Sequence, residues 1–195
     1  MQYSPAIEKA IQKAAILHEG QRRKGSQEPP YVTHLFAVAA ILSGHTDDEE
    51  VIIAGLLHDT LEDTDYTKEE LQFEFGERVA AIVAGVTIPT PEDGEKSTWV
   101  GSRERYIENL KNAPKESLLV SGADKIHNFL SVLDSFTENP EEFRKNFHGS
   151  IQDRIAAYTE IVETITVGLP EHTLSKELHE VFKEYRQFLE EIKKL

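Results

Sequence analysis

Apolar residues recur at helical spacing along most of this 195-residue chain, and this periodicity is the feature that most restricts its fold. In the first segment Ala6, Ala10, Ala14 and Leu17 follow one another every three or four positions, which is the spacing of one helix face. Asn-Gly turn signals are absent, and the alternation of β-branched residues that is typical of strands is scarce. The sequence therefore predicts an all-α protein.

Capping signals predict where several helices begin. Ser4 followed by Pro5 favours a first turn, because a proline there loses no hydrogen bond that the helix needs. Thr46 with Glu49, and Thr67 with Glu70, have the spacing of a capping box. The expected helices are a first one that ends before Gly20, a second over 32–43, two that begin after Thr46 and Thr67, and others over 77–86, 103–111, 114–136, 150–168 and 174–194.

Two polar stretches, 21–30 and 87–101, interrupt the helical pattern, and the second contains the single tryptophan, Trp99. Both are rich in Gly, Pro, Ser, Thr and charge, and loops of this length in a compact domain are often functional. We expect one domain over 1–195, in which the helices of 150–195 form a C-terminal extension that packs on the rest and provides packing or oligomer surface.

The charge balance limits the partners. With 21 basic and 35 acidic residues the formal charge is −14, so we expect neither nucleic acid nor an anionic membrane, both of which need basic surface. A small anionic ligand is still compatible with a local basic cluster. The N-terminus carries charges where a signal peptide has an apolar core, which favours a cytoplasmic location. Since the chain has no cysteine, any transition metal must be held by His, Asp or Glu.

Ionisable residues interrupt three otherwise apolar segments. His34 lies within YVTHLFAVAAIL, His58 and Asp59 follow VIIAGLL, and Asp124 lies within SLLVSGADKI. Buried charges are costly unless a cation or a hydrogen-bond partner offsets them. One interpretation is a set of unrelated core histidines and salt-bridged acids, and the other is convergence around one divalent ion. Two imidazoles and two carboxylates without sulfur suit Mn²⁺, Fe²⁺ or a similar metal.

Glu62 and Asp63 follow His58 and Asp59 at a spacing of four residues. On one continuous helix this spacing places His58 and Glu62 on one face, and Asp59 and Asp63 on the adjoining face. Glu62 and Asp63 would then lie about 6 Å further along the helix axis than His58 and Asp59. If a metal binds, Glu62 and Asp63 would flank its water as general acid/base or orienting groups.

The other histidines are expected to be structural or exposed. We expect the His18 imidazole to cap the carbonyls at the end of the first helix as a cation. His45, His148, His172 and His179 lie in polar or amphipathic contexts, and we interpret them as surface residues.

Five blocks of sequence resemble a known family. They are H-E-G-Q-R-R-K-G (18–25), P-Y-V-T-H (30–34), A-G-L-L-H-D-T-L-E-D-T (54–64), F-G-E-R-V-A (75–80) and L-L-V-S-G-A-D-K-I-H-N (118–128). In this order they resemble the HD-domain superfamily, and more closely the small alarmone (p)ppGpp hydrolases of the RelA/SpoT type, the class of the metazoan SpoT homologues. The resemblance runs from Ala14 to about Leu133 and implies the helical bundle of the HD domain.

The resemblance also implies the roles of individual residues. It places the metal ligands at His34, His58, Asp59 and Asp124, a catalytic acidic pair at Glu62 and Asp63, and substrate contacts at Arg23, Lys24, Ser26, Tyr31 and Asn128. Manganese is the usual ion of this family. The chain departs from the family pattern in a loop before Pro30 that is longer by one residue, and at Leu130, where the family often has arginine. The stretch 87–105 matches loosely, and it suggests Arg103, Arg105 and the adjacent Tyr106 as phosphate contacts.

Three functions are compatible with the sequence. The first is metal-dependent hydrolysis of the 3′-pyrophosphate of ppGpp or pppGpp, which gives GDP or GTP and pyrophosphate. The second is an HD phosphohydrolase on another nucleotide, such as the 2′-phosphate of NADPH. The third is a catalytically silent regulatory module, against which the intact set of candidate ligands argues. The expected partner is a small nucleotide substrate, and the sequence leaves homo-oligomerisation open.

Overall fold

The computed structural model describes residues 2–23, 28–89, 98–137, 140–146 and 150–194. Every regular element in these ranges is an α-helix, and an isolated antiparallel bridge pairs Arg22 with Pro30. The all-α prediction is confirmed. The helices are α1 (Pro5–Leu17), α2 (Val32–Ser43), α3 (Glu49–Leu57), α4 (Thr60–Asp63), α5 (Lys68–Phe75), α6 (Glu77–Val86), α7 (Trp99–Asn112), α8 (Lys115–Phe136), α9 (Pro140–Asn146), α10 (Ile151–Gly168) and α11 (Thr173–Ile192).

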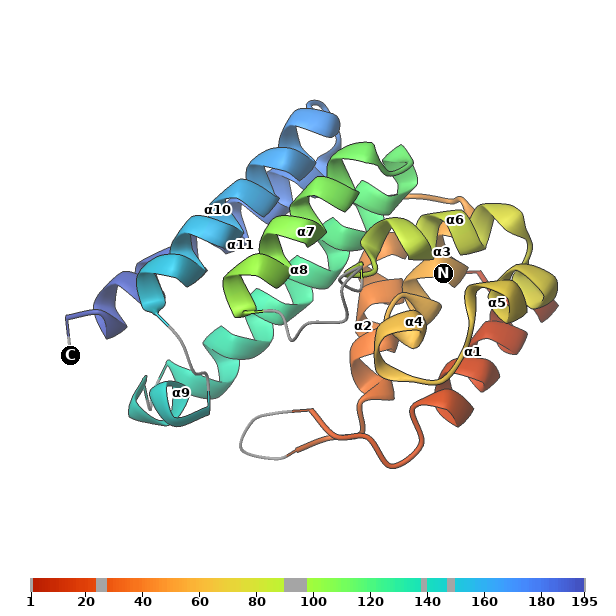
Figure 1. Ribbon diagram of the computed structural model, residues 1–195, viewed down its shortest axis with the longest axis horizontal. Helices are drawn as coiled ribbons and strands as arrows, with labels where there is room; N and C mark the ends of the chain where they lie inside the picture. Colours follow the sequence, from red (N-terminus) through yellow and green to blue (C-terminus); the bar gives the residue numbers. More distant parts are fainter. Residues whose placement is uncertain (1, 24–27, 90–97, 138–139, 147–149, 195) are drawn as a thin grey trace.

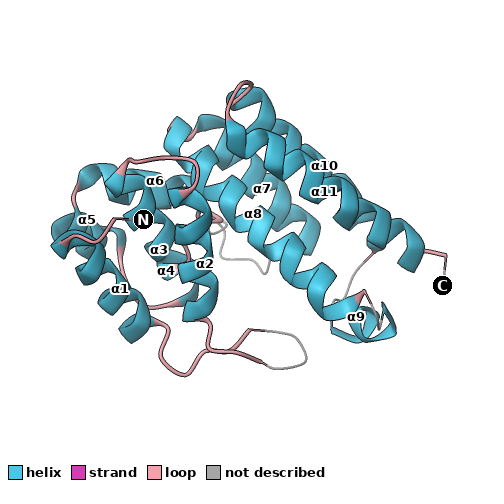
Figure 2. Cartoon of the chain, turned by 180° about the vertical axis from the view of Figure 1, so that it is seen from behind, coloured by secondary structure: helices cyan, strands magenta, loops and turns pink. Residues whose placement is uncertain are grey.

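The helices form two groups that meet along α8 (Figure 1). Helices α1 to α6 make up one group, and α7, α10 and α11 run beside α8 in the other, as the view from behind also shows (Figure 2). Helix α8 packs against α10 and α11 on one side and against α2, α3 and α6 on the other. None of the helices in the described ranges is long and apolar enough to cross a bilayer.

Helix α3 lies at the centre of the first group because it is apolar on all sides. Every residue from Val51 to Leu57 is buried, and Gly55 lets α2 approach closely: a Cβ there would lie 2.3 Å from Leu42 Cδ1. A helix that is apolar all round is stable only when other elements cover it. The polar residues that follow Leu57 therefore begin inside the protein, and this is where the candidate site lies.

Most helix limits follow the sequence signals, but α3 and α7 begin at residues other than those expected, and α9 lies where the sequence predicted no helix. The capping box of Thr67 and Glu70 is present at α5, as expected. At α3 the N-cap is Asp48, whose side chain accepts from Glu50 N, while Thr46 Oγ1 accepts from Asp48 N. The predicted capping box of Thr46 is thus wrong. Helix α7 begins four residues before the expected start, because the Thr98 side chain caps it.

The expectation of one continuous helix through His58 and Asp59 is also wrong. Helix α3 ends at Leu57, and a separate short helix, α4, begins at Thr60. His58 Nδ1 donates to the Gly55 carbonyl, and Thr60 Oγ1 donates to the Leu57 carbonyl. Side chains that bond the backbone in this way compete with the helical hydrogen bonds. Glu62 and Asp63 therefore lie on a different helix from the residues that precede the break.

Candidate metal centre and nucleotide site

The four expected metal ligands converge, although they come from three parts of the fold. His34 lies on α2, His58 and Asp59 lie in the turn between α3 and α4, and Asp124 lies on α8. Asp59 Oδ2 is 3.1 Å from His58 Nε2 and 3.6 Å from His34 Nε2. Asp124 Oδ1 is 3.1 Å from His34 Nε2 and 3.7 Å from His58 Nε2.

This spacing fits a divalent cation. Ligand atoms about 2.1 Å from an ion and at right angles to each other are about 3 Å apart. The candidate ligand atoms of His34, His58 and Asp59 all lie within 4.8 Å of one another. His58 Nε2 is buried without a hydrogen-bond partner among the described residues, while its Nδ1 is engaged by a backbone carbonyl. The free nitrogen thus points toward both carboxylates. The four residues could hold a metal ion. Asp124 also forms an ion pair with Lys125.

The electrostatics of the cluster favour a positive charge between the two carboxylates. Burial lowers the pKa of His34, and the neighbouring Asp124 opposes this effect in part. Burial would also lower the pKa of His58, but Asp59 and Asp124 raise it well above the ordinary value. For Asp124, burial would raise the pKa, but Lys125 and the two imidazoles lower it well below its usual range. The carboxylates therefore stay charged and attract a cation.

A second layer of side chains orients the candidate ligands. His34 Nδ1 and His127 Nδ1 are 2.7 Å apart, so one of these nitrogens donates to the other. Tyr31 donates its hydroxyl proton to Asp59 Oδ2 at 2.6 Å. Burial, followed by the neighbouring His34, lowers the pKa of His127 to about 4. Outer partners of this kind hold metal-ligating imidazoles and carboxylates in place.

Asp124 has its own outer partners on α8. The Lys125 ammonium donates to Asp124 Oδ2, and the Asn128 amide donates to Asp124 Oδ1. Lys125 is buried, and its ammonium lies 5.0 Å from the centre of the Tyr106 ring. The Asp124 carboxylate thus contacts Lys125 and also lies beside the imidazoles of His34 and His58.

Glu62 and Asp63 line the same cavity of about 180 Å³ as the four candidate ligands. Both remain in contact with solvent. Glu62 Oε1 accepts from the Ile88 amide at 2.6 Å. Reduced hydration raises the pKa of Glu62, against the effect of this hydrogen bond. Reduced hydration and then the charge of Asp59 raise the pKa of Asp63. Carboxyl groups with raised pKa values beside a candidate metal site are suited to proton transfer.

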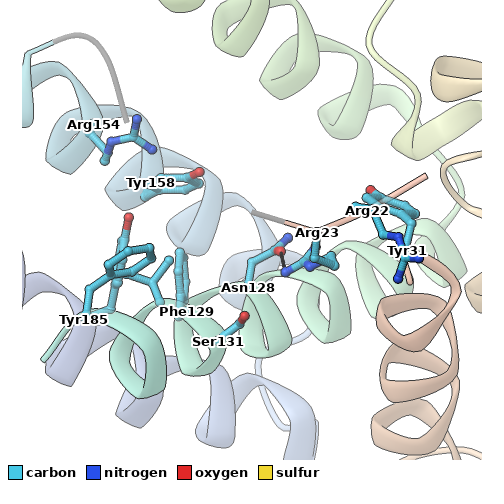
Figure 3. Close-up of a pocket in the computed structure, with 11 residues that line it drawn as sticks. Arg22, Arg23, Tyr31, Asn128, Phe129, Ser131, Arg154, Tyr158 and Tyr185 are labelled. Atoms are coloured by element: carbon cyan, nitrogen blue, oxygen red, sulfur yellow. Dashed lines mark hydrogen bonds between the residues drawn. The ribbon is translucent and has the colours of Figure 1, made fainter. Parts of the chain in front are cut away.

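Two of the expected substrate contacts, Arg23 and Asn128, meet at the mouth of the site. Arg23 Nη2 donates to Asn128 Oδ1 at 2.9 Å, and the guanidinium lies 5.8 Å from the centre of the Tyr31 ring (Figure 3). Tyr31 also lines the cavity, although its hydroxyl is engaged by Asp59. Lys24 and Ser26 lie outside the described residues.

A second cavity of about 300 Å³ adjoins the first, because Arg23, Tyr31, Asn128 and Tyr158 line both. Its far end is formed by the C-terminal helices, where Arg154 and Tyr158 of α10 lie near Tyr185 of α11 (Figure 3). The helices of 150–195 thus line a cavity in addition to packing on α8. No local signal marks Arg154 or Tyr158, because only the packing of α10 on α7 and α8 brings them to the cavity.

Two interpretations of isolated histidines need correction. The His18 ring is buried, bonds Gln21 Oε1 through Nδ1 and stacks on Tyr31 at 5.2 Å, so it does not cap carbonyls. His45 is 11% exposed and bonds Thr173 and Glu177 of α11, so it joins two parts of the fold rather than lying free on the surface.

His172 is half-buried, and its ring lies 6.2 Å from that of His45. His179 is exposed, as expected, and His148 lies outside the described residues.

Comparison with known proteins agrees with this geometry. A family model described as "HD domain" matches residues 10–153. The chain is 46% identical over 118 residues to a guanosine-3′,5′-bis(diphosphate) 3′-pyrophosphohydrolase, MESH1, of Danio rerio, a match that covers 59% of this chain and 62% of that protein. It is 39% identical over 127 residues to a GTP pyrophosphokinase of Streptomyces coelicolor, covering 65% of this chain and 14% of that enzyme.

A solved structure also matches. It belongs to a metazoan ortholog of SpoT described as hydrolysing ppGpp, with a TM-score of 0.75, 28% identity, and coverage of 94% of this chain and 97% of that one. The expected relationship to HD-domain proteins and alarmone hydrolases is confirmed. The sequence matches span less than two thirds of the relatives' own length.

Proposed function

The chain belongs to the HD-domain family, and we propose that it catalyses the metal-dependent removal of the 3′-pyrophosphate from ppGpp or pppGpp. The observation that carries this proposal is the convergence of His34, His58, Asp59 and Asp124 in a cavity that also contains Glu62 and Asp63. The similarity to 3′-pyrophosphohydrolases supports the choice of substrate.

The metal that we propose is Mn²⁺. His34 and His58 would bind it through Nε2, and Asp59 and Asp124 through carboxylate oxygens, a sulfur-free set that suits manganese. When bound, a divalent ion polarises a phosphoryl oxygen and lowers the pKa of water.

The chain's own residues would carry the proton and hold the substrate. Glu62 or Asp63 accepts a proton from the attacking water, whose oxygen bonds to the phosphorus on the ribose 3′ oxygen. The bond between that phosphorus and the ribose oxygen breaks, and the ribose oxygen takes the proton that the carboxylate accepted from the water. The products are GDP or GTP and pyrophosphate. Arg23 and Asn128 line both cavities and would hold the nucleotide, with Lys24 and Ser26 as further contacts.

The test is a comparison of substrates with purified protein supplied with Mn²⁺. We expect ppGpp to give GDP and pyrophosphate, in equal amounts, faster than NADPH loses its 2′-phosphate. The Glu62→Gln variant serves as the matched control, because its side chain has nearly the same shape but cannot accept the proton. Faster turnover of NADPH would favour the other phosphohydrolase. Unchanged ppGpp hydrolysis after removal of metal by a chelator would contradict the proposal.

A further inference from the structure

Arg103 of α7 is a cation in the metal cavity that the proposed chemistry does not use. It lines the same cavity of about 180 Å³ as His34, His58 and Glu62. Its Nε is buried without a hydrogen-bond partner within the described ranges. Nor does any carboxylate of those ranges lie within 4 Å of its guanidinium. A buried donor without a partner costs free energy, so its retention at a cavity wall points to a ligand.

An aromatic side chain holds this guanidinium in place. Arg103 follows Trp99 by one helical turn, and its guanidinium carbon lies 5.5 Å from the centre of the indole. Trp99 also contacts α10, where Tyr158 meets it edge to face with 6.3 Å between ring centres and the Arg154 guanidinium lies 5.0 Å from the indole centre. A planar guanidinium stacked on an indole keeps its charge and its donors, and is fixed at lower entropic cost than a free side chain.

The other cations near the cavity are already engaged. Lys125 contacts Asp124, and Arg23 donates to Asn128. Arg105, which the family resemblance also suggested as a phosphate contact, donates from Nε to the Pro89 carbonyl. The Tyr106 hydroxyl is buried against Ser121 at 2.6 Å. Of the three candidates on α7, Arg103 and Tyr106 line the cavity, and of these two only Arg103 has no hydrogen bond or ion pair among the described residues.

We infer that Arg103 binds the outer phosphoryl group of a diphosphate whose inner phosphoryl group lies at the metal cluster. The inference rests on the proposed function and adds a determinant of specificity to it. A divalent ion held by the four candidate ligands would engage a single phosphate and the inner group of a diphosphate alike. Arg103 lines the same cavity without belonging to the ligand set, and it would contact only the outer group. Arg103 thus makes the site select a diphosphate over a monophosphate at the reacting position.

The experiment compares the binding of inorganic pyrophosphate and inorganic phosphate at a fixed, saturating concentration of free Mn²⁺. Trp99 is the only tryptophan of the chain, so its fluorescence reports on the stacked guanidinium, and calorimetry provides the affinities of the variants. We expect Arg103→Gln to weaken pyrophosphate binding by about 10- to 100-fold, the range for a hydrogen bond to a charged group. Binding of phosphate should change by less than about threefold.

Two further variants make the result specific. Arg105→Gln, the matched arginine on the same helix, should leave the ratio of the two affinities unchanged. Arg103→Lys keeps the charge without the planar fork and should lose part of the preference. If Arg103→Gln lowers both affinities equally, or neither, the inference is wrong. Because binding of these anions needs no turnover, that failure differs from failure of the proposed function, which the substrate comparison detects.

Discussion

Two clusters of charged side chains in this protein have opposite character. In the first, Arg78 of α6 bonds Asp48, Glu50 and Glu116 at 2.6–2.9 Å, and the four side chains are 34–45% exposed. In the second, the candidate metal centre, the His34 and His58 side chains are 1% and 4% exposed, and no lysine or arginine of the described residues except Lys125 forms an ion pair with the two carboxylates.

The contrast shows how environment separates a structural cluster from a functional one. Water hydrates the Arg78 cluster, and its arginine satisfies the carboxylates that lie at the starts of α3 and α8. The metal centre has little water, so its charges depend on one another and on a cation from outside. Substitutions in the Arg78 cluster should therefore lower stability without changing activity. Substitutions in the metal centre should lower activity while the fold persists. The predictions below test this division.

The largest effect is expected from the candidate ligands. His58→Ala or Asp124→Asn should abolish metal binding and lower the rate of hydrolysis by more than about 100-fold. Loss of a residue that only orients a metal ligand typically costs about 10–100-fold. The helical fold should persist, because the surrounding apolar helices remain packed. Metal content by elemental analysis and circular dichroism check this, with exposed His179→Ala as control. Full metal occupancy in either variant would remove that residue from the ligand set.

The next effect concerns chemistry without metal binding. Glu62→Gln and Asp63→Asn should each lower kcat by at least about 100-fold while metal affinity is retained, because proton transfer typically contributes this much. Since reduced hydration in the cavity raises both pKa values, the acid limb of the pH–rate profile should lie above the ordinary values of 4.5 and 3.8. Asp65→Asn, an exposed neighbour, is the control. Near wild-type rates in both variants would mean that another group accepts the proton.

A smaller effect is expected at His127, which acts through His34. When His34 Nε2 faces a metal, its Nδ1 carries the proton and donates to His127 Nδ1. His127→Leu removes the acceptor and should weaken metal binding by about 10–100-fold, whereas His127→Gln keeps an acceptor and should restore most of it. Metal titration measures this, with His45→Gln as control. Equal losses in the two His127 variants would indicate a packing role.

The smallest effect is expected at Arg78. Arg78→Ala should lower the unfolding free energy by about 1–2 kcal/mol, and Tm by about 2–8 °C, since exposed ion pairs contribute little each. Metal affinity and kcat should not change. Thermal unfolding tests this, and Lys111→Ala, which breaks one exposed pair, should have a smaller effect. A loss of activity would contradict the division between the two clusters.

The same variant has a pH signature. Arg78 lowers the pKa values of Asp48 and Glu116 below 3.8 and 4.5. A carboxyl with a lowered folded-state pKa adds stability above its unfolded value and loses it as the pH falls through the folded value. The difference in stability between wild type and Arg78→Ala should therefore be full above pH 4.5 and should close below pH 3.8.

Local sequence signals determined the helices and the polar residues inside them. The periodicity predicted α2 and α6 with their observed limits, and the capping box at Thr67 is present. The blocks around His34, His58 and Asp124 also identified the candidate ligands, because polar groups in apolar segments need a reason to be there. These features depend on neighbours within about one or two helical turns, so the sequence alone expresses them.

Only the tertiary structure decided how those residues meet. The break after Leu57 removes the face that His58 and Glu62 were expected to share, so these side chains reach one cavity through the way that α3 and α4 pack. The contact of His34 with His127 and the place of Arg103 in the cavity join residues from separate helices. Such contacts are set by which apolar faces pack together, and no local pattern contains that information.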